Sequence, residues 1–231
     1  MSGFFERSEA LLGAPAMTAL GAAHVLVVGV GGVGSWCAEA LVRTGIGRVT
    51  LVDDDEVAPS NVNRQCPATA LTVGRPKVEA MAERLREINP SCGVTALPVR
   101  YPDAAIPPLG GFAAVVDAID SVDGKAELIL AATAAGTPLV SSMGAAFRID
   151  PTQVRVTRFE KVEGDGLARA LRRRFKRLGR FPSARFSCVW SAETPCATSP
   201  SSSRGSLMPV TATFGLCLAS EVIRLVAQGV R

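Results

Sequence analysis

A glycine-rich turn near the start of the sequence has the pattern that receives phosphate groups. Gly29, Gly31, Gly32 and Gly34 fall within a short stretch that ends at Ser35. At such a turn the backbone amides and the N-terminus of the following helix can point at an anion, and the missing side chains let a nucleotide come close. The same turn serves enzymes that use NAD, FAD, S-adenosylmethionine or ATP. By itself it predicts a nucleotide site and not a reaction.

Acidic residues follow at two further places. Asp53, which opens an acidic cluster that includes Asp55, stands about 20 residues after the glycines, where a carboxylate usually accepts hydrogen bonds from ribose. Asp120 and Ser121 follow an expected strand, at the edge of the sheet where doubly wound folds bind ligands. A carboxylate beside a triphosphate is a natural magnesium ligand. The alternative for Asp120 or Ser121 is a helix N-cap.

Polar and cationic residues between these acidic groups separate the candidate reactions. Asn61, Arg64 and Gln65 lie close together, and Lys77 follows at the start of an expected helix. An enzyme that cleaves a triphosphate must neutralise the charge that develops on the departing pyrophosphate, which Arg64 and Lys77 could do. Asn61 and Gln65 could donate further hydrogen bonds. The alternative is that both cations are ordinary solvated charges.

An alternation of strands and helices must position these residues. The chain is 48% hydrophobic and 5% aromatic, which favours parallel strands covered by helices. Apolar runs predict strands at residues 25–29, 49–52, 94–99, 113–116 and 138–142. Helical spacing predicts helices at residues 35–43, 77–88, 125–135 and 209–226. The apolar side of the last helix is expected to include Leu216, Ala219, Ile223 and Val226. The alternation implies parallel crossovers, so we expect a Rossmann-like, doubly wound α/β sheet.

The pattern changes in the C-terminal part of the chain. We expect one domain over residues 1–231, with a nucleotide-binding half at 1–149 and a basic, substrate-binding half at 150–231. Residues 154–157 alternate like an antiparallel strand, which would extend the sheet. Residues 192–206 are rich in Ser, Pro and Thr and are expected to form a mobile loop.

Positive charge concentrates at residues 151–187. The net charge of this stretch is +8, whereas that of the whole chain is +4, an asymmetry expected of a nucleic-acid contact surface. Leu167, Leu171, Phe175 and Leu178 are spaced to form the inward stripe of a helix. The outward cations, which could hold phosphates, are Arg169, Arg172, Arg173, Arg174, Lys176 and Arg177. The alternative is an ordinary solvated helix face.

Cysteine and histidine usage argues against a structural zinc site and against disulfides. The six cysteines include no Cys-x-x-Cys pair, and His24 is the only histidine, so a structural zinc site is not expected. Scattered thiols indicate a reducing compartment, and no secretory signal or membrane span is visible, so we expect a cytoplasmic protein. Cys188 has no flanking cation to activate it and is interpreted as a packed thiol.

Together these motifs resemble the ubiquitin-activating-like adenylating superfamily. The residues that carry the resemblance are the glycine turn, Asp53, Ser60-Asn61-Val62-Asn63-Arg64-Gln65, Gly74-Arg75-Pro76-Lys77 and Asp117-Ala118-Ile119-Asp120. In detail the sequence is similar to the tRNA threonylcarbamoyladenosine dehydratase branch, in stretches such as Arg43-Thr44-Gly45-Ile46-Gly47, Cys188-Val189-Trp190-Ser191-Ala192-Glu193 and Val210-Thr211-Ala212-Thr213-Phe214-Gly215. The zinc-binding cysteine pairs of the sulfur-carrier-activating branch are absent, which favours the dehydratase branch.

The resemblance implies a homodimer that binds ATP and Mg²⁺ and adenylates the carboxylate of threonylcarbamoyladenosine in tRNA. Loss of AMP then closes a ring, with net removal of water. It further implies that Gly31 and Gly32 line the nucleotide, that Asp53 holds the ribose and that Asp120 holds magnesium. The phosphate ligands it implies are Asn61, Arg64 and Lys77. Arg7 matches an arginine that reaches the ATP of the partner subunit.

Three other functions stay open at this point. Adenylation of the C-terminal glycine of a sulfur-carrier or ubiquitin-like protein would use the same nucleotide site. A nicotinamide-dependent oxidoreductase would explain the glycine turn and Asp53 but would leave Arg64, Lys77 and Asp120 without a task. A non-catalytic RNA-binding module would explain the arginines alone. The sequence does not decide whether a sulfur-transfer protein or a monovalent cation takes part.

Overall fold

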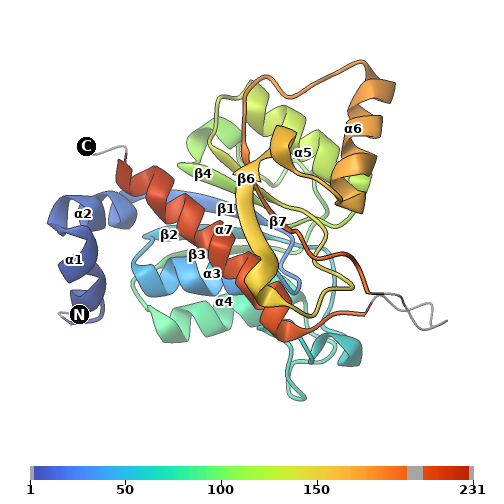
Figure 1. Cartoon of the computed structure of the whole chain (residues 1–231). Coiled ribbons are helices and arrows are strands. Elements are labelled where there is room, and N and C mark those ends of the chain that lie inside the picture. Colours follow the sequence, from blue (N-terminus) through green and yellow to red (C-terminus); the bar gives the residue numbers. More distant parts are fainter. Residues whose placement is uncertain (1–2, 197–204, 229–231) are drawn as a thin grey trace.

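A single mixed sheet organises the chain. The computed structural model describes residues 3–196 and 205–228, and within these ranges seven strands pair in the order β3-β2-β1-β4-β5-β7-β6 (Figure 1). The parallel strands are β1 (His24–Val28), β2 (Arg48–Val52), β3 (Gly93–Leu97), β4 (Ala114–Asp117), β5 (Leu139–Ser142) and β7 (Ser187–Ser191). The edge strand β6 (Val154–Arg158) runs antiparallel to β7. The predicted Rossmann-like sheet with an antiparallel extension is confirmed.

Helices cover both faces of the sheet (Figure 1). On one face lie α3 (Gly34–Thr44), α4 (Lys77–Ile88) and α7 (Met208–Gln228), with α2 (Ala14–Ala22) at their end. On the other face lie α5 (Val122–Ala134) and α6 (Gly166–Leu178). The short helix α1 (Glu6–Leu12) precedes α2. The three-layer arrangement explains why the central strands β4 and β5 are buried along their whole length.

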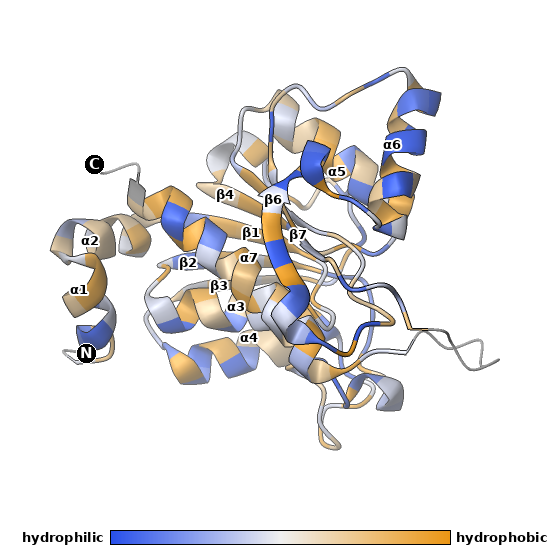
Figure 2. Cartoon of the chain, in the orientation of Figure 1, coloured by the Kyte–Doolittle hydropathy of each residue, from blue (hydrophilic) through white to orange (hydrophobic). Residues whose placement is uncertain are grey.

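Strand β1 illustrates how the sequence produces this burial. Side chains alternate across a strand, so Val25 and Val27 pack under α3 and α7, while Leu26 and Val28 pack under α5. All four are fully or almost fully buried. Figure 2 shows the strands as an apolar layer, with hydrophilic residues on the outer faces of the helices. The run is therefore continuous and not alternating, as expected of a parallel strand covered on both sides.

The amphipathic helices follow their predicted bounds closely, but two apolar stripes differ in detail. In α6 Leu171 and Phe175 are buried as expected, whereas Leu178, its last residue, is 38% exposed. In α7 Leu216 lies on the exposed side, and the buried side is instead formed by Val210, Phe214, Leu218, Ala219 and Val222. Apolar residues lie on both sides of α7, so the sequence pattern alone does not show which side faces inward. The packing of α7 against α3 does.

Three elements were not anticipated from the sequence. Helices α1 and α2 bury few side chains, so their apolar pattern is weak. Strand β7 is short and mixes polar with apolar residues, although all five of its residues are buried.

In the part of the chain that the structure describes, α7 is the one helix long and apolar enough to cross a membrane, with a mean hydropathy of 1.6 over Met208–Ala227. Of that window 44% is buried, and the inward side chains of α7 pack in the core.

Candidate functional site

The glycine turn lies at the carboxyl end of β1, against the end of β4. Gly29 has a φ of 90°, and a Cβ atom there would stand 2.6 Å from the carbonyl oxygen of Ala118. A Cβ atom on Gly34 would collide with the carbonyl oxygen of Gly29. These two glycines are therefore required by close backbone approach, since any side chain would push the turn open. The turn leads directly into the N-terminus of α3, where a phosphate can be received.

Asp53, at the end of β2, is held against this turn. One carboxylate oxygen accepts a hydrogen bond from the Val30 amide at 2.6 Å, and the other accepts one from the Asp55 amide at 3.0 Å. Burial raises the pKa of Asp53, while Lys77 and the two amides act in the opposite direction. Its side chain is 10% exposed. Asp53 is thus a rigid, partly desolvated acceptor at the place where the sequence predicts the ribose.

Lys77, the first residue of α4, points to the same acidic group. Its ammonium lies 2.6 Å from a carboxylate oxygen of Asp55 and 4.0 Å from one of Asp53, and its side chain is only 7% exposed. A lysine that is nearly buried has little freedom, so its charge stays at the entrance of the glycine turn. The carboxylates of Asp53, Asp54 and Asp55 come within 4.8 Å of one another. The structure therefore brings Asp53, Asp55 and Lys77 together as predicted.

The loop around the 3₁₀ turn Pro59–Asn61 places the other predicted polar residues beside the glycines. Arg64 donates hydrogen bonds to the Ser60 carbonyl at 2.8 Å and to Asn63 Oδ1 at 2.9 Å. Its aliphatic stem lies against Gly32, where a Cβ atom would come within 3.2 Å of Arg64 Cγ. The indole of Trp36 donates to the Arg64 carbonyl at 2.9 Å and fixes the loop on α3.

Two amide side chains in this loop are buried. Asn61 Oδ1 accepts a hydrogen bond from the Ala58 amide at 3.0 Å, so this oxygen shapes the loop. Gln65 is 7% exposed, and its Oε1 atom has no hydrogen-bond partner among the described residues. The Gln65 amide nitrogen faces Gly31, where a Cβ atom would lie 3.8 Å away. Buried polar atoms are normally paired, so the Oε1 atom of Gln65, beside the glycine turn, is a natural acceptor of a hydrogen bond from a ligand.

The end of β4 carries a buried ionic group that the sequence analysis did not identify. Asp117 and Lys125 are fully buried, with 2.8 Å between the ammonium and a carboxylate oxygen. Ser141 donates to the same carboxylate oxygen at 2.6 Å, and the Ile119 amide donates to the other at 3.2 Å. Lys125, the one lysine of α5, was the available signal. This group holds the backbone that leads to Asp120.

Asp120 and Ser121 lie just beyond that group. Both are exposed, and Ser121 precedes α5 without a side-chain capping hydrogen bond. The Ala118 amide donates to the Val28 carbonyl at 2.8 Å, so the segment before Asp120 is fixed beside the glycine turn. The N-cap alternative is thus not supported for the Ser121 side chain. An exposed carboxylate at this edge can take a cation together with phosphate oxygens.

A second residue that the sequence analysis missed follows β5. Arg148 is 4% exposed, and its Nε atom has no hydrogen-bond partner within the described ranges. Its neighbour Phe147 has a φ of 61°, which is uncommon outside glycine and needs support from its surroundings. That support comes from hydrogen bonds to Gly205 and Cys196. A buried guanidinium lacking such a partner is expected to meet an anion.

The segment predicted as a mobile loop borders this region, but its residues 197–204 lie outside the described part of the chain. At its described ends, Cys196 and Gly205 bind Phe147, and the Ser206 carbonyl accepts a hydrogen bond from Asn63 at 3.0 Å. These contacts join the loop of Arg148 to the loop of Arg64. Cys188, on β7, is a packed thiol as predicted. It is fully buried, and burial raises the pKa of its thiol, which disfavours a nucleophilic thiolate.

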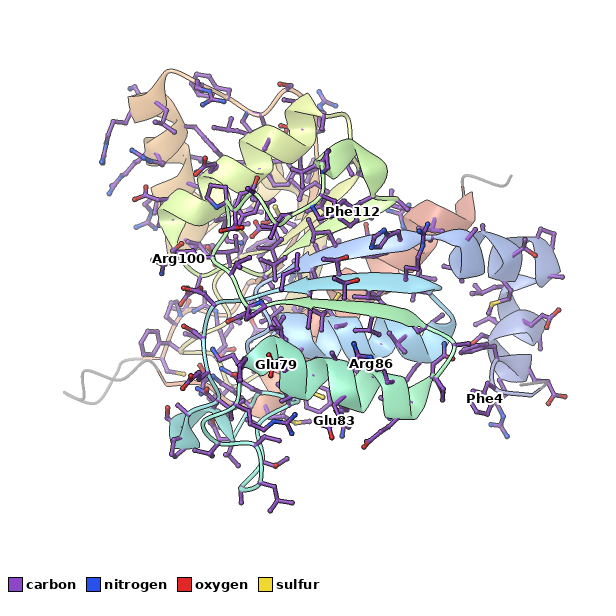
Figure 3. All side chains as sticks on the ribbon, turned by 180° about the vertical axis from the view of Figure 1, so that it is seen from behind. Phe4, Glu79, Glu83, Arg86, Arg100 and Phe112 are labelled. Carbon is purple, nitrogen blue, oxygen red and sulfur yellow. The ribbon has the colours of Figure 1, made fainter. Side chains whose placement is uncertain are left out.

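Arg7 is not brought to this site within one chain. It is exposed on α1, which leads through α2 into the amino end of β1, whereas the glycine turn follows the carboxyl end. Figure 3 shows the same separation through Phe4, next to α1, and Arg100, which pairs with Asp54 at 3.4 Å. The two lie at opposite ends of the molecule. Figure 3 also shows Glu79, Glu83 and Arg86 on α4, where all three are exposed.

The basic residues of α6 form a surface on the other half of the chain, seen in Figure 2 as a hydrophilic helix. Arg169, Arg173, Lys176 and Arg177 are exposed. Two of the six predicted phosphate ligands have internal contacts. Arg174 lies 2.8 Å from a carboxylate oxygen of Asp123, and Arg172 donates to the carbonyls of Phe159 and Val162. Arg172 is exposed as well despite these contacts, so five of the six cations present their charge to a polyanion.

Comparison with known proteins identifies the family. The model of the ThiF family matches residues 5–230 of this chain. The chain belongs to the ThiF family. ThiF-family relatives include the tRNA threonylcarbamoyladenosine dehydratase of Escherichia coli K12, which is 41% identical over 95% of this chain and 92% of its own length. The Bacillus subtilis protein of the same name is 41% identical over 76% of this chain and 70% of its own length.

A solved ThiF-family structure agrees with the fold and with the nucleotide class. The E. coli tRNA N6-threonylcarbamoyladenosine dehydratase TcdA in complex with ATP aligns with a TM-score of 0.87 at 40% identity, over 97% of this chain and 94% of that one. This likeness covers both halves of the molecule, including the antiparallel extension of the sheet. A nicotinamide-dependent oxidoreductase, which stayed open from the sequence, finds no support here.

Proposed function

We propose that this chain is an ATP-dependent dehydratase that cyclises N6-threonylcarbamoyladenosine in tRNA through an acyl-adenylate. The observation that carries the proposal is the cluster of Asp53, Asp55 and Lys77 at the glycine turn, on the same sheet as the basic surface of α6. The cluster at the glycine turn would bind a triphosphate, and the basic surface of α6 would bind a polyanion. The identity of 41% over nearly the whole chain to a named dehydratase supports the same reaction.

The nucleotide contacts follow from the positions of the side chains. In this proposal the amides of Gly31 and Gly32 meet a phosphate, and the carboxylate of Asp53 accepts hydrogen bonds from ribose. The further candidates for nucleotide contact are Gly29, Gly34, Asp55, Asn61, Arg64, Gln65, Lys77, Asp120 and Ser121. Lys77 is already held near the turn by Asp55, so little side-chain entropy is lost when a phosphate arrives. Arg64 would turn from Ser60 and Asn63 to the departing pyrophosphate.

Mg²⁺ fits the acidic side of the site. Asp120 would hold it, because its carboxylate is exposed at the edge where the phosphates would lie and Mg²⁺ combines carboxylate with phosphate ligands. Mg²⁺ bound there would neutralise charge on the triphosphate during cleavage. The buried contact between Asp117 and Lys125 keeps the preceding backbone in place, so that Asp120 projects from a rigid support.

The reaction needs a place for the substrate carboxylate. A carboxylate oxygen attacks the α-phosphorus of ATP, forming the acyl-adenylate and releasing pyrophosphate. A nucleophilic atom of the carbamoyl group then loses its proton and attacks the activated carbonyl carbon. The ring closes as AMP leaves, and AMP carries away one oxygen of the original carboxylate. We assign Arg148 to the carboxylate, because its guanidinium is buried beside the loops that meet at Phe147 and Asn63.

The division of labour runs along the chain. In this proposal residues 1–149 hold the nucleotide and residues 150–231 hold the RNA, within one domain, and Arg148, next to the boundary, holds the reacting carboxylate. Arg169, Arg172, Arg173, Arg174, Lys176 and Arg177 form the RNA-binding surface in this proposal. In this proposal the protein acts in the cytoplasm, in keeping with the free thiols among the described residues.

A second copy of the chain completes the site in this proposal. Arg7 lies at the far end of its own sheet, so it can reach a triphosphate only in a partner subunit of a homodimer. Mixing an Arg7→Ala chain with a Lys77→Ala chain tests this arrangement. Each homodimer should be inactive, whereas heterodimers with one intact composite site should recover part of the activity. No recovery at a confirmed dimer would refute the role of Arg7.

The function is tested with purified protein, ATP, Mg²⁺ and tRNA that carries threonylcarbamoyladenosine. AMP release together with a nucleoside lighter by one water supports the dehydratase. ATP binding without any change in the tRNA refutes it and moves the search to the C-terminal glycine of a sulfur-carrier protein, the second candidate substrate. A sulfur-transfer protein that acts as a partner would raise the rate of AMP release when added to the same mixture.

A further inference from the structure

A cavity lies beside α6, on the opposite side of the basic half from the nucleotide site. Its volume is about 340 Å³, within the range of small-ligand pockets, which begins at about 300 Å³. Four phenylalanines and two arginines dominate its wall: Phe159, Arg172, Phe175, Phe181, Arg185 and Phe186. The site described above uses none of the phenylalanines. The cavity is therefore a separate feature of the molecule.

One wall of the cavity is a column of flat groups that is fixed without a ligand. Arg172 donates from Nη2 to the carbonyls of Phe159 at 2.9 Å and Val162 at 2.7 Å. Its guanidinium carbon stands 5.0 Å from the centre of the Phe159 ring. Behind it, the rings of Phe159 and Phe186 stack with 5.1 Å between centroids and 19° between planes. A guanidinium held in this way is a preorganised surface for a further flat group.

Phe181 supplies the accessible aromatic ring of the cavity. It is 64% exposed, whereas Phe159, Phe175 and Phe186 are buried. Phe181 follows α6 directly and precedes β7 by a few residues, in a segment without helix or strand. Phe181 therefore presents apolar surface at the cavity that a bound ligand would bury.

The charge around the cavity selects the class of ligand. Residues 151–187 carry a net charge of +8, and exposed arginines stand on both sides of Phe181. Flat aromatic groups joined by negative charges are what single-stranded nucleic acid offers. Unstacked bases bind on aromatic rings and guanidinium planes, while the neighbouring phosphates bind arginines.

The cavity is too far from the glycine turn to hold the reacting nucleoside. Phe186 precedes the first residue of β7, and β7 runs parallel to β5, so the cavity lies at the amino edge of the sheet. The glycine turn lies at the carboxyl edge. The two edges are separated by a strand of five residues, roughly 17 Å. A base in the cavity must therefore be another nucleotide of the same RNA.

We propose that the cavity lined by Phe159, Arg172 and Phe181 binds an unstacked base of the substrate tRNA, at a subsite separate from the reacting nucleoside. The inference rests on the proposed function only in taking tRNA as the ligand. The base stacks between the Arg172 guanidinium and the Phe181 ring, and Arg185 contacts a neighbouring phosphate. The subsite contributes affinity and orientation and takes no part in the chemistry.

The test measures binding of an unmodified tRNA transcript without ATP, so that it does not depend on dehydration. Replacing Phe181 by Ala should weaken binding by roughly 5- to 150-fold, the worth of one stacked base. Phe181→Trp should bind within about twofold of the unaltered protein, because indole also stacks. Leu178→Ala, an exposed apolar position of the same half that does not line the cavity, is the matched control and should not change affinity.

The dependence on salt separates stacking from charge. Phe181→Ala should lower affinity at every salt concentration without changing the slope of log affinity against log salt, since no phosphate contact is lost. Unchanged affinity in Phe181→Ala, or failure of Phe181→Trp to restore it, overturns the subsite while tRNA remains the ligand. No binding of the transcript by the unaltered protein overturns tRNA as the ligand, and the subsite with it. Thermal unfolding of each variant confirms that the exposed positions leave the fold intact.

Discussion

Replacing Lys125 by Met should destabilise the protein severely, because it leaves a buried carboxylate without its cation. Asp117 and Lys125 are both 0% exposed, with 2.8 Å between the Lys125 ammonium and a carboxylate oxygen of Asp117. Ser141 and the Ile119 amide donate further hydrogen bonds to this carboxylate. Removing one partner of such a pair costs about 3–5 kcal/mol. For a chain of this size each kcal/mol lowers the melting temperature by about 2–4 °C, so a fall of roughly 6–20 °C is expected.

The assay is thermal unfolding at pH 7 with a double variant as reference. Asp117→Asn combined with Lys125→Met removes both charges and should recover at least about 2 kcal/mol of the loss, since a neutral pair avoids the uncompensated charge. Lys161→Met, an exposed lysine, is the matched control and should stay within about 0.5 kcal/mol. A loss below about 1 kcal/mol for Lys125→Met, or a double variant no more stable than the single one, would refute the reasoning.

Three further predictions concern the site and its support. Lys77→Gln should raise the Kd for ATP about 10- to 100-fold in calorimetry, because a buried cation at the glycine turn is lost, while Lys176→Gln should leave it unchanged. Gly34→Ala should cost about 1–3 kcal/mol in thermal unfolding and abolish ATP binding, since its Cβ meets the Gly29 carbonyl; normal ATP affinity would show that the turn can yield. Glu39 should make stability fall in acid: burial opposes its ionisation, but hydrogen bonds from Arg84, Cys66 and Arg43 lower its pKa from 4.5 to about 2. Because the folded-state pKa is lowered, this stabilisation is present above pH 4.5 and is lost toward pH 2, by at most about 3 kcal/mol and less to the extent that solvent screens the partly exposed arginines. Unfolding temperatures of the protein and of Glu39→Gln between those pH values should converge in acid, and parallel curves would contradict the assignment.

The local features that are encoded by short-range patterns were predictable. Five of the six parallel strands, all except β7, were predicted from apolar runs. Helix α4 begins and ends at the predicted residues because Lys77 to Ile88 has clear helical spacing before Asn89 and Pro90. The glycine turn, Asp53 and Lys77 also come together as expected, since parallel strands end at one edge of the sheet.

Features that depend on contacts between distant segments were not predictable. Strand β7 carries Ser187, Cys188 and Ser191, and only its place between β5 and β6 makes it a buried strand. The pairing of Lys125 with Asp117 and the burial of Arg148 likewise arise from tertiary packing, because a lone lysine or arginine in a sequence reads as a surface charge. The inward face of α7 was misassigned at Leu216 for the same reason.

The pairing of β5 with β7 has a consequence for how an RNA is selected. Backbone hydrogen bonds of one continuous sheet join the nucleotide half to the basic half, so the two cannot open or close as separate bodies without breaking strand pairs. The sheet therefore limits how far the glycine turn and the support of α6 can move apart. If α6 binds the RNA backbone as proposed, only an RNA whose reacting nucleoside and phosphates match that spacing can occupy both places at once.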